Sequence, residues 1–236
     1  MTGEMTPQPL AVEPAGELLA DLTIEKDGRE IFFRRRVPAS RLEQMKVSAG
    51  LGIFFRYDVE RQKETLIKIA RMDYGNIVIA HTPENEIVGY VTAHPVDAEE
   101  RWAVLNQPSD INPAGKLYVC EFGAVEVSRQ YRGWGISSRL MQAAFASDSW
   151  YDDKIVVSVE FAWHWDYEEA GLTKLAYRKM LRKVISSAGF EAMDTDEPNI
   201  LMDPANMFMV RLGKEASLEV QQRFFSLLHK DNRWGF

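Results

Sequence analysis

Cysteine and histidine are scarce in this chain of 236 residues, which contains one cysteine and four histidines. Cys120 has no partner for an internal disulfide, and within an apolar stretch it is expected to be a small core residue rather than a nucleophile. The histidines are scattered and show none of the ligand spacings that are typical of zinc sites. The sequence therefore predicts neither a disulfide framework nor a bound metal.

Long hydrophobic runs are also lacking. No apolar stretch approaches the roughly 20 residues that a membrane-spanning helix needs. The first residues, Met-Thr-Gly-Glu-Met-Thr-Pro, include neither the basic patch nor the apolar segment of a signal peptide. We therefore expect a soluble, cytoplasmic protein that has no membrane partner.

Positive charge is in deficit, because 28 Lys and Arg residues stand against 35 Asp and Glu residues, a formal net charge of −7. Nonspecific binding to nucleic acids depends on clustered positive charge, so this balance argues against a nucleic-acid partner. Hydrophobic residues make up 46% and charged residues 27%, as in globular domains with a substantial core. We expect a flexible, proline-containing lead over residues 1–18 and a single domain over residues 19–236.

Turn residues and hydrophobic periodicity predict the order of the elements. An Asp27-Gly28 turn indicates a first hairpin between Leu22 and Phe33. Further strands are expected at 76–80, 87–93, 116–127, 154–161 and 207–212, with another beginning at Gly189-Phe190. Helices are expected at 41–47 after a Ser40 cap, from an Asp58 cap onward, and at 136–145, 172–188 and 217–229. This order predicts a mixed α/β (α+β) fold rather than a regularly alternating doubly wound sheet.

One turn has a pattern that suits a phosphate group. The segment Gln130-Tyr131-Arg132-Gly133-Trp134-Gly135 lies between a predicted strand and a predicted helix, which begins with Ile136-Ser137-Ser138. The two glycines allow a sharp turn that exposes successive backbone N–H groups, and the positive end of the helix dipole adds to an anion site. A tight turn into an ordinary helix is the simpler interpretation of the same glycines.

Other phosphate-binding loops fit this turn less well. The dinucleotide fingerprint G-x-G-x-x-G would need a glycine at Ser138 and normally lies in the first strand-to-helix turn, although Asp152 and Asp153 are suitably spaced for a ribose contact. The Walker A pattern is absent, and neither the H-R-D nor the D-F-G motif of kinases occurs.

The hexad that ends at Gly135 resembles, residue for residue, the Q/R-x-x-G-x-G/A signature of the GCN5-related N-acetyltransferases (GNAT). Gly189-Phe190 is similar to the helix-to-strand junction of that superfamily. The resemblance implies the GNAT fold, a mixed, mostly antiparallel sheet that is flanked by helices and splayed between its two central strands. It also implies acetyl-CoA as cosubstrate, bound by the following residues: Val125, Glu126, Val127, Gln130, Arg132, Gly133, Trp134, Gly135, Ile136, Ser137 and Ser138.

A closer resemblance covers most of the chain, from about Leu22 to Gly213. Five stretches are similar to the acetoin-utilization acetyltransferases of Gram-positive bacteria: residues 87–92, 123–127, 163–166, 195–198 and 209–213. That family is understood to acetylate a lysine of acetyl-CoA synthetase and so to switch it off, which implies a protein acceptor as partner. Two alternatives stay open, namely acetylation of a small amine and a regulator that binds acyl-CoA without turnover.

The chemistry of acetyl transfer selects the candidate bases. A lysine amine, with an ordinary pKa of roughly 10.4, must lose a proton before it attacks a thioester. The resemblance implies that residues 123–127 form the wall beside the thioester and that a backbone N–H of this strand stabilises the oxyanion. Glu121, Glu126 and Glu160 are therefore the candidate bases, and strand alternation places Glu121 and Glu126 on opposite faces.

The remaining candidates are aromatic or lie near aromatic residues. The superfamily's usual general-acid tyrosine corresponds to Ile185 here, so Tyr177, two helical turns earlier, is the expected substitute unless the thiolate leaves unassisted. In the segment Trp163-His164-Trp165-Asp166, the histidine and the aspartate could form a relay. Its tryptophans are expected either to line the acceptor groove or to close the core.

Overall fold

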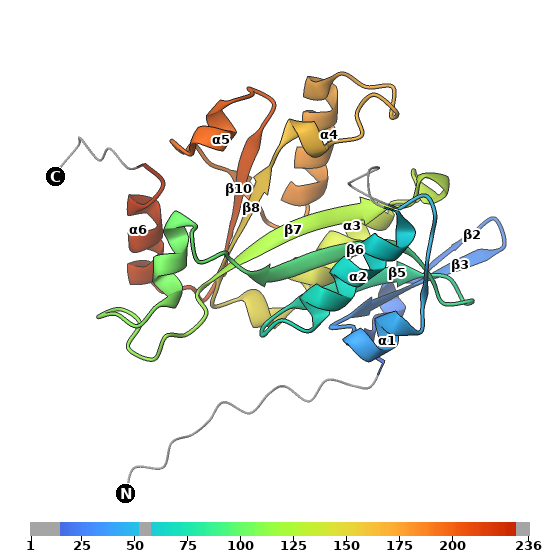
Figure 1. Cartoon of the computed structure of the whole chain (residues 1–236), viewed down its shortest axis with the longest axis horizontal. Coiled ribbons are helices and arrows are strands. Elements are labelled where there is room, and N and C mark those ends of the chain that lie inside the picture. Colours follow the sequence, from blue (N-terminus) through green and yellow to red (C-terminus); the bar gives the residue numbers. More distant parts are fainter. Residues whose placement is uncertain (1–14, 52–57, 230–236) are drawn as a thin grey trace, which may run out of the picture.

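The structure is a computed structural model that describes residues 15–51 and 58–229. Within these residues it has ten strands: β1 Glu17–Leu18, β2 Ile24–Lys26, β3 Arg29–Arg35, β4 Lys46–Val47, β5 Asn76–His81, β6 Glu86–Pro95, β7 Val119–Val127, β8 Ile155–Glu160, β9 Glu191–Ala192 and β10 Met207–Leu212. They form one sheet in the order β1-β3-β5-β6-β7-β8-β10-β9, with β2 paired to β3 and β4 paired to β6 (Figure 1). The pairs β7–β8 and β4–β6 are parallel, whereas consecutive strands such as β5 and β6 pair antiparallel. The expected mixed, mostly antiparallel sheet is confirmed.

Helices cover both faces of this sheet (Figure 1). One face is covered by α1 (Ala39–Glu43), α2 (Val59–Ala70) and α6 (Leu218–Ser226), and the other by α3 (Ile136–Met141) and α4 (Lys174–Ser186). The short helix α5 (Pro198–Leu201) precedes β10. The largest buried cluster lies between the sheet and the α3–α4 layer. No helix among the described residues is long and apolar enough to cross a membrane.

Several local predictions from the sequence are confirmed. The first hairpin turns at Asp27 and Gly28, whose φ angles of 51° and 69° suit a two-residue turn. The Asp58 carboxylate accepts a hydrogen bond of 2.8 Å from the Arg61 amide and caps α2. Gly189 ends the α4 segment with a φ of 86°, and Phe190 then packs edge-on against Phe145, with ring centroids 5.1 Å apart. Each of these features depends on residues that are close in sequence.

The prediction of a helix over residues 41–47 with a Ser40 cap was wrong. Helix α1 begins after Pro38 and ends at Glu43, and Pro38 at its N-cap has no side-chain hydrogen bond to offer. Lys46 and Val47 instead form β4, because Val47 pairs with Ile87 and buries its side chain against α2 and the sheet. Most of the expected lead over residues 1–18 lies outside the described residues, but Glu17 and Leu18 pair with β3 and therefore belong to the sheet.

The two central strands separate partway along their length. β7 and β8 are paired only from Val119 and Ile155 to Glu121 and Val157. Beyond Glu121, β7 continues to Val127 alongside β6, while β8 continues to Glu160 alongside β10. The expected splay is therefore confirmed, and it leaves one edge of residues 122–127 of β7 without β8 as its partner.

A β-bulge at Gly123 corrects the predicted faces of β7. Ala93 pairs with Phe122 and Thr92 with Ala124, so Gly123 is an extra residue in β7. The extra residue reverses the alternation of side chains, and Glu121 and Glu126 consequently lie on the same face of the sheet. The prediction that they lie on opposite faces was wrong, because regular alternation assumes a strand without bulges.

Candidate active site

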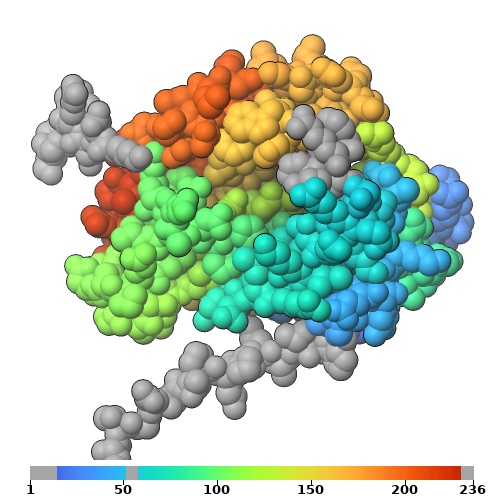
Figure 2. Space-filling model, in the orientation of Figure 1, coloured from blue at the N-terminus to red at the C-terminus, as the bar shows by residue number. Residues whose placement is uncertain are grey.

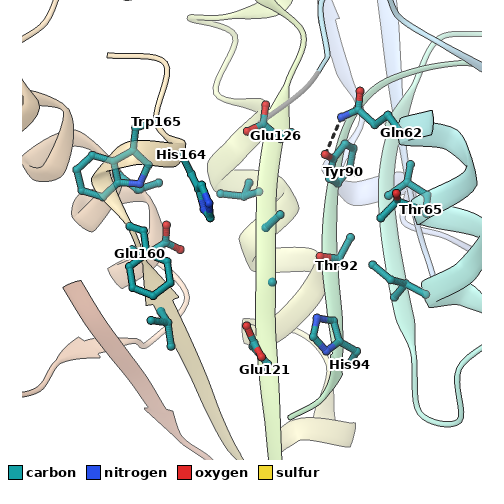
Figure 3. A pocket seen from close by; sticks show the side chains of 18 of the residues that line it. Gln62, Thr65, Tyr90, Thr92, His94, Glu121, Glu126, Glu160, His164 and Trp165 are labelled. Atoms are coloured by element: carbon teal, nitrogen blue, oxygen red, sulfur yellow. Dashed lines mark hydrogen bonds between the residues drawn. The ribbon is translucent and has the colours of Figure 1, made fainter. Parts of the chain in front are cut away.

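A cavity of about 380 Å³ opens where β7 and β8 separate (Figure 3). Its walls come from α2, β6, β7, β8, the segment that follows β8, and α4, with Glu100 after β6 and Asn199 in α5 also lining it. In the space-filling view of the same face, side chains of α2, of the segment after β6 and of the segments near α4 and α5 border a recess (Figure 2). We call this space the acceptor cavity.

Negative charge dominates the lining of the acceptor cavity. The lining residues include no lysine or arginine among the described part of the chain, and its carboxylates come from five residues: Glu100, Glu121, Glu126, Glu160 and Asp166. All three candidate bases predicted from the sequence are therefore brought together in one space (Figure 3). Such a cavity favours a cationic ligand such as a protonated amine.

Burial changes the acidity of two of these glutamates. Desolvation raises the pKa of Glu160 to about 7, against the opposing effect of a 2.9 Å hydrogen bond that the Ser158 hydroxyl donates to it. Desolvation also raises the pKa of Glu121, while the nearby His94 acts to lower it and the carboxylates of Glu100 and Asp97 raise it further. Burial therefore favours the neutral form of both glutamates, and a cation bound beside either one would oppose this by favouring the ionised form.

The raised pKa of Glu160 predicts a pH-dependent stability. In the wild type, protonated Glu160 makes its full contribution to the stability of the folded state below the ordinary glutamate pKa of about 4.3. This contribution is lost as the pH rises through about 7. Glutamine does not titrate, so the Tm of Glu160→Gln minus the Tm of wild type should increase by several degrees between about pH 4 and pH 8. Thermal melts at three pH values measure this, with the exposed Glu168→Gln as the matched control. A Tm difference that stays constant over this range contradicts the prediction.

The glycine loop that precedes α3 has the geometry of an anion site. Gly133 and Gly135 have φ angles of 79° and 75°, in the region that favours glycine. A Cβ at Gly133 would meet no atom within 4 Å, so the space in front of this backbone is open to a ligand. Gly135 is the N-cap of α3 and supplies no capping side chain, which leaves the first N–H groups of the helix for an external acceptor.

A second hollow of about 190 Å³, which we call the cofactor groove, lies along this loop. Eight of the residues expected to bind acetyl-CoA line it: Val125, Glu126, Val127, Arg132, Gly133, Gly135, Ile136 and Ser137. The open backbone at Gly133 suits an anionic group, and the separated edge of β7 offers peptide groups to an extended ligand. The sequence did not identify Tyr131, Met180 and Val184, which also line the groove.

Three expected cofactor residues lie outside the lining of the groove. Gln130 donates a 3.2 Å hydrogen bond to the hydroxyl of Ser48, which ties the loop to the residue that follows β4. Trp134 packs edge-on against Tyr131 and lies under the ammonium of Lys26, 5.2 Å from its ring centroid. Ser138 is exposed on the first turn of α3. These side chains support the loop or flank it.

The two hollows meet at Tyr177 on α4. Tyr177, Val125, Glu126 and Leu181 line both of them. The Tyr177 ring stacks on Trp165 with centroids 5.6 Å apart, and burial together with the charge of Glu126 raises its pKa to about 12. Ile185, at the position of the superfamily's usual tyrosine, is fully buried in the core. Tyr177 therefore lies at the junction of the acceptor cavity and the cofactor groove.

The two tryptophans of the segment after β8 lie in different environments. Trp165 is 9% exposed and belongs to the main core while one part of it lines the acceptor cavity, whereas Trp163 is 49% exposed and stacks on Phe161. Asp166 accepts a 2.9 Å hydrogen bond from Arg132 of the glycine loop, in an ion pair. The carboxylate thus connects the acceptor side to the cofactor loop.

Sequence reasoning missed the residues that β6 and α2 supply to the acceptor cavity. Tyr90, Thr92 and His94 alternate along β6 and lie opposite Glu126, Ala124 and Glu121. From α2, the Gln62 amide donates a 2.8 Å hydrogen bond to the Tyr90 hydroxyl (Figure 3). The alternation of side chains along β6 could have indicated that these residues share one face. Placing them in the cavity also requires the pairing of β6 with β7, which the sequence does not give.

Two other expectations concern cysteine and metal. Cys120 is buried in the main core, and burial raises the pKa of its thiol to about 12, so the core role predicted for it is confirmed. In the part of the chain that the structure describes, no three or more His, Cys, Asp or Glu residues are grouped so as to hold a metal ion.

Comparison with known proteins gives consistent matches. The acetyltransferase (GNAT) family matches residues 47–147. Acetoin utilization protein AcuA of Bacillus licheniformis is 36% identical over 70% of this chain and 73% of its own length, and that of Bacillus subtilis is 36% identical over 69% and 72%. The crystal structure of an acetoin utilization protein from Exiguobacterium sibiricum has a TM-score of 0.79 at 30% identity, covering 90% of this chain and 94% of that chain. The family match spans the glycine loop and all of β7, including its bulge.

Proposed function

This chain belongs to the acetyltransferase (GNAT) family, and we propose that it transfers the acetyl group of acetyl-CoA to a lysine side chain of a protein. The observation that supports this most directly is the junction of an acidic acceptor cavity with a groove at the glycine loop. An ammonium group would enter the cavity from one side of the sheet, and a thioester would reach the same point from the other. N-acetyltransferases of this family use acetyl-CoA, and the glycine loop offers backbone donors for its pyrophosphate.

Each part of the site has a task in this proposal. The backbone of residues 133–137 would bind the pyrophosphate, and the separated edge of β7 would orient the donor arm. A backbone N–H on the edge of β7 that has separated from β8 would donate a hydrogen bond to the oxyanion as the amine adds to the thioester. The hydroxyl of Tyr177 would give a proton to the departing thiolate.

The rim of the acceptor cavity supports a protein as acceptor. Three large apolar side chains are exposed close in sequence to the lining residues His164 and Asn199: Trp163 at 49%, Leu201 at 67% and Met202 at 74%. Asn206 joins the two segments, since its side chain accepts a bond from the Ala162 amide and donates one to the Asn199 carbonyl, each 2.8 Å long. A free small amine would leave this apolar rim unused, whereas a protein loop would cover it.

Acetyl-CoA synthetase is the acceptor to test first, because the related proteins that match this chain are acetoin utilization proteins and their family implies it. The pure enzyme is incubated with labelled acetyl-CoA and either acetyl-CoA synthetase, polyamines or free amino acids. We expect label on lysine residues of the synthetase. Faster acetylation of the small amines than of any protein contradicts the protein-acceptor proposal and favours a small amine as substrate.

Replacing Trp163 tests the docking rim separately. Trp163→Ala should raise KM for the protein acceptor about tenfold, equivalent to about 1.4 kcal/mol, because an exposed aromatic anchor is lost. Its Tm and its affinity for acetyl-CoA should stay close to wild type. Phe225→Ala on α6, which removes an aromatic ring that is 41% exposed, is the matched control and should leave KM unchanged. An unchanged KM in Trp163→Ala would place the docking surface elsewhere.

A further inference from the structure

His94 lies on β6 with its side chain in the acceptor cavity, directly across from Glu121 on β7 (Figure 3). Its Nδ1 atom is 2.9 Å from the carbonyl oxygen of Pro95. A carbonyl oxygen only accepts hydrogen bonds, so Nδ1 must carry the hydrogen, and in the neutral ring the lone pair is on Nε2. This contact holds the imidazole in the tautomer that can take up a proton at Nε2.

The ring of His94 lies against the bulge of β7. A Cβ at Gly123 would be 3.0 Å from Nε2 of His94 and 2.9 Å from Oγ1 of Thr92. A glycine is required for the ring and the backbone to approach this closely. β7 has already separated from β8 at Gly123, and the separated edge is where the proposed function places the thioester. The lone pair of Nε2 therefore lies beside that edge.

The three glutamates of the cavity are less suited to accept the proton at this point. Glu160 accepts a hydrogen bond from the Ser158 hydroxyl on β8, and burial raises its pKa to about 7, so a substantial part of it is protonated at neutral pH. Glu126 lies farther along β7, opposite Tyr90 and three residues beyond the bulge. Glu121 is opposite His94, where a carboxylate stabilises a positive imidazole.

We propose that His94 is the general base of the transfer and that Glu121 is a positioning residue that stabilises its protonated ring. The proposal rests on acetyl transfer at this site and not on the identity of the acceptor. Nε2 takes one proton from the ammonium of the acceptor, and the neutral nitrogen forms a bond to the thioester carbon. The C–S bond then breaks, Tyr177 gives its proton to the departing thiolate, and the second proton of the amine nitrogen passes to the Tyr177 oxygen. His94 finally releases its proton to solvent, which leaves an amide, a thiol and both side chains in their starting forms. Imidazole is the side chain that most often serves as a general base near neutral pH.

His94→Asn is the sharpest test, since Asn can keep the donor to the Pro95 carbonyl while it removes Nε2. We expect kcat to fall by about 10²–10⁴-fold with the affinity for acetyl-CoA and the Tm nearly unchanged. The acidic limb of the pH–kcat profile should disappear. The other titratable groups around the His94–Glu121 pair, which also affect this profile, are Asp97 and Glu100 after β6 and Glu160 on β8. Imidazole added to the His94→Ala variant should raise its kcat at least tenfold.

Several outcomes would overturn this role. A kcat of His94→Asn within threefold of wild type does so, as does a change confined to KM. A loss of rate that keeps the acidic limb, and that imidazole does not restore in His94→Ala, indicates a packing role instead. If the wild type acetylates a small amine rather than a protein, the same measurements are made on that amine. Failure of the proposed acceptor and failure of the His94 role are therefore distinguishable.

Discussion

Gly133→Asp should weaken the binding of acetyl-CoA by roughly a hundredfold, or about 2.7 kcal/mol. The Cβ of residue 133 would enter open space, so the new side chain would occupy the hollow that the loop offers to a pyrophosphate. A carboxylate there faces a second negative group, and like charges brought together at a binding site cost several kcal/mol. Isothermal titration with acetyl-CoA measures the loss directly.

The matched control for this variant is Gly28→Asp in the turn between β2 and β3. Gly28 also has a positive φ of 69°, and a Cβ there would likewise meet no atom within 4 Å. Both variants impose the same backbone strain and the same added charge on an exposed turn, so they should have similar Tm values. A folded Gly133→Asp protein whose affinity for acetyl-CoA equals that of Gly28→Asp would show that the loop does not bind the pyrophosphate.

Tyr177→Phe should lower kcat by about 10²-fold while leaving the affinity for acetyl-CoA within a few-fold of wild type. The ring would still stack on Trp165 and line both hollows, so only the hydroxyl is lost. Since burial holds the pKa of Tyr177 at about 12, the hydroxyl keeps its proton up to strongly alkaline pH and is available to a leaving thiolate. Steady-state rates and acetyl-CoA titrations on the same preparation separate the two effects.

Tyr131→Phe is the control for the loss of a tyrosine hydroxyl near the cofactor. Tyr131 lines the groove and packs against Trp134 but does not line the acceptor cavity. Its kcat should stay within a few-fold of wild type. If Tyr177→Phe also keeps a kcat within threefold of wild type, the thiolate leaves without a proton from Tyr177.

The cofactor side of the site could be predicted from sequence because its geometry is local. The two glycines of the loop have the positive φ angles that their spacing before a helix suggested, and the first turn of α3 begins directly at Gly135. The Asp27-Gly28 turn and the Asp58 cap were predictable for the same reason. In each case the interacting groups are separated by only a few residues along the chain.

The acceptor side depended on strand pairing, which no local pattern specifies. The bulge at Gly123 is visible only as a shift in register between β6 and β7, and it moves Glu126 to the face that holds Glu121. The same pairing brings His94 across from Glu121, although the two residues are distant in sequence. Likewise, Lys46 and Val47 became a strand because an edge of β6 was available to them.

The sequence by itself determined the order of most elements, the glycine loop before α3 and the acidic character of the chain. The tertiary structure alone decided which side chains share the acceptor cavity, that Tyr177 stands where the two hollows meet, and that Trp165 is largely buried while Trp163 is exposed. The physical reason is that turn and cap conformations follow from steric limits and hydrogen bonds within a few residues. The face that a strand residue occupies follows instead from its register with a distant partner, and one inserted residue reverses it.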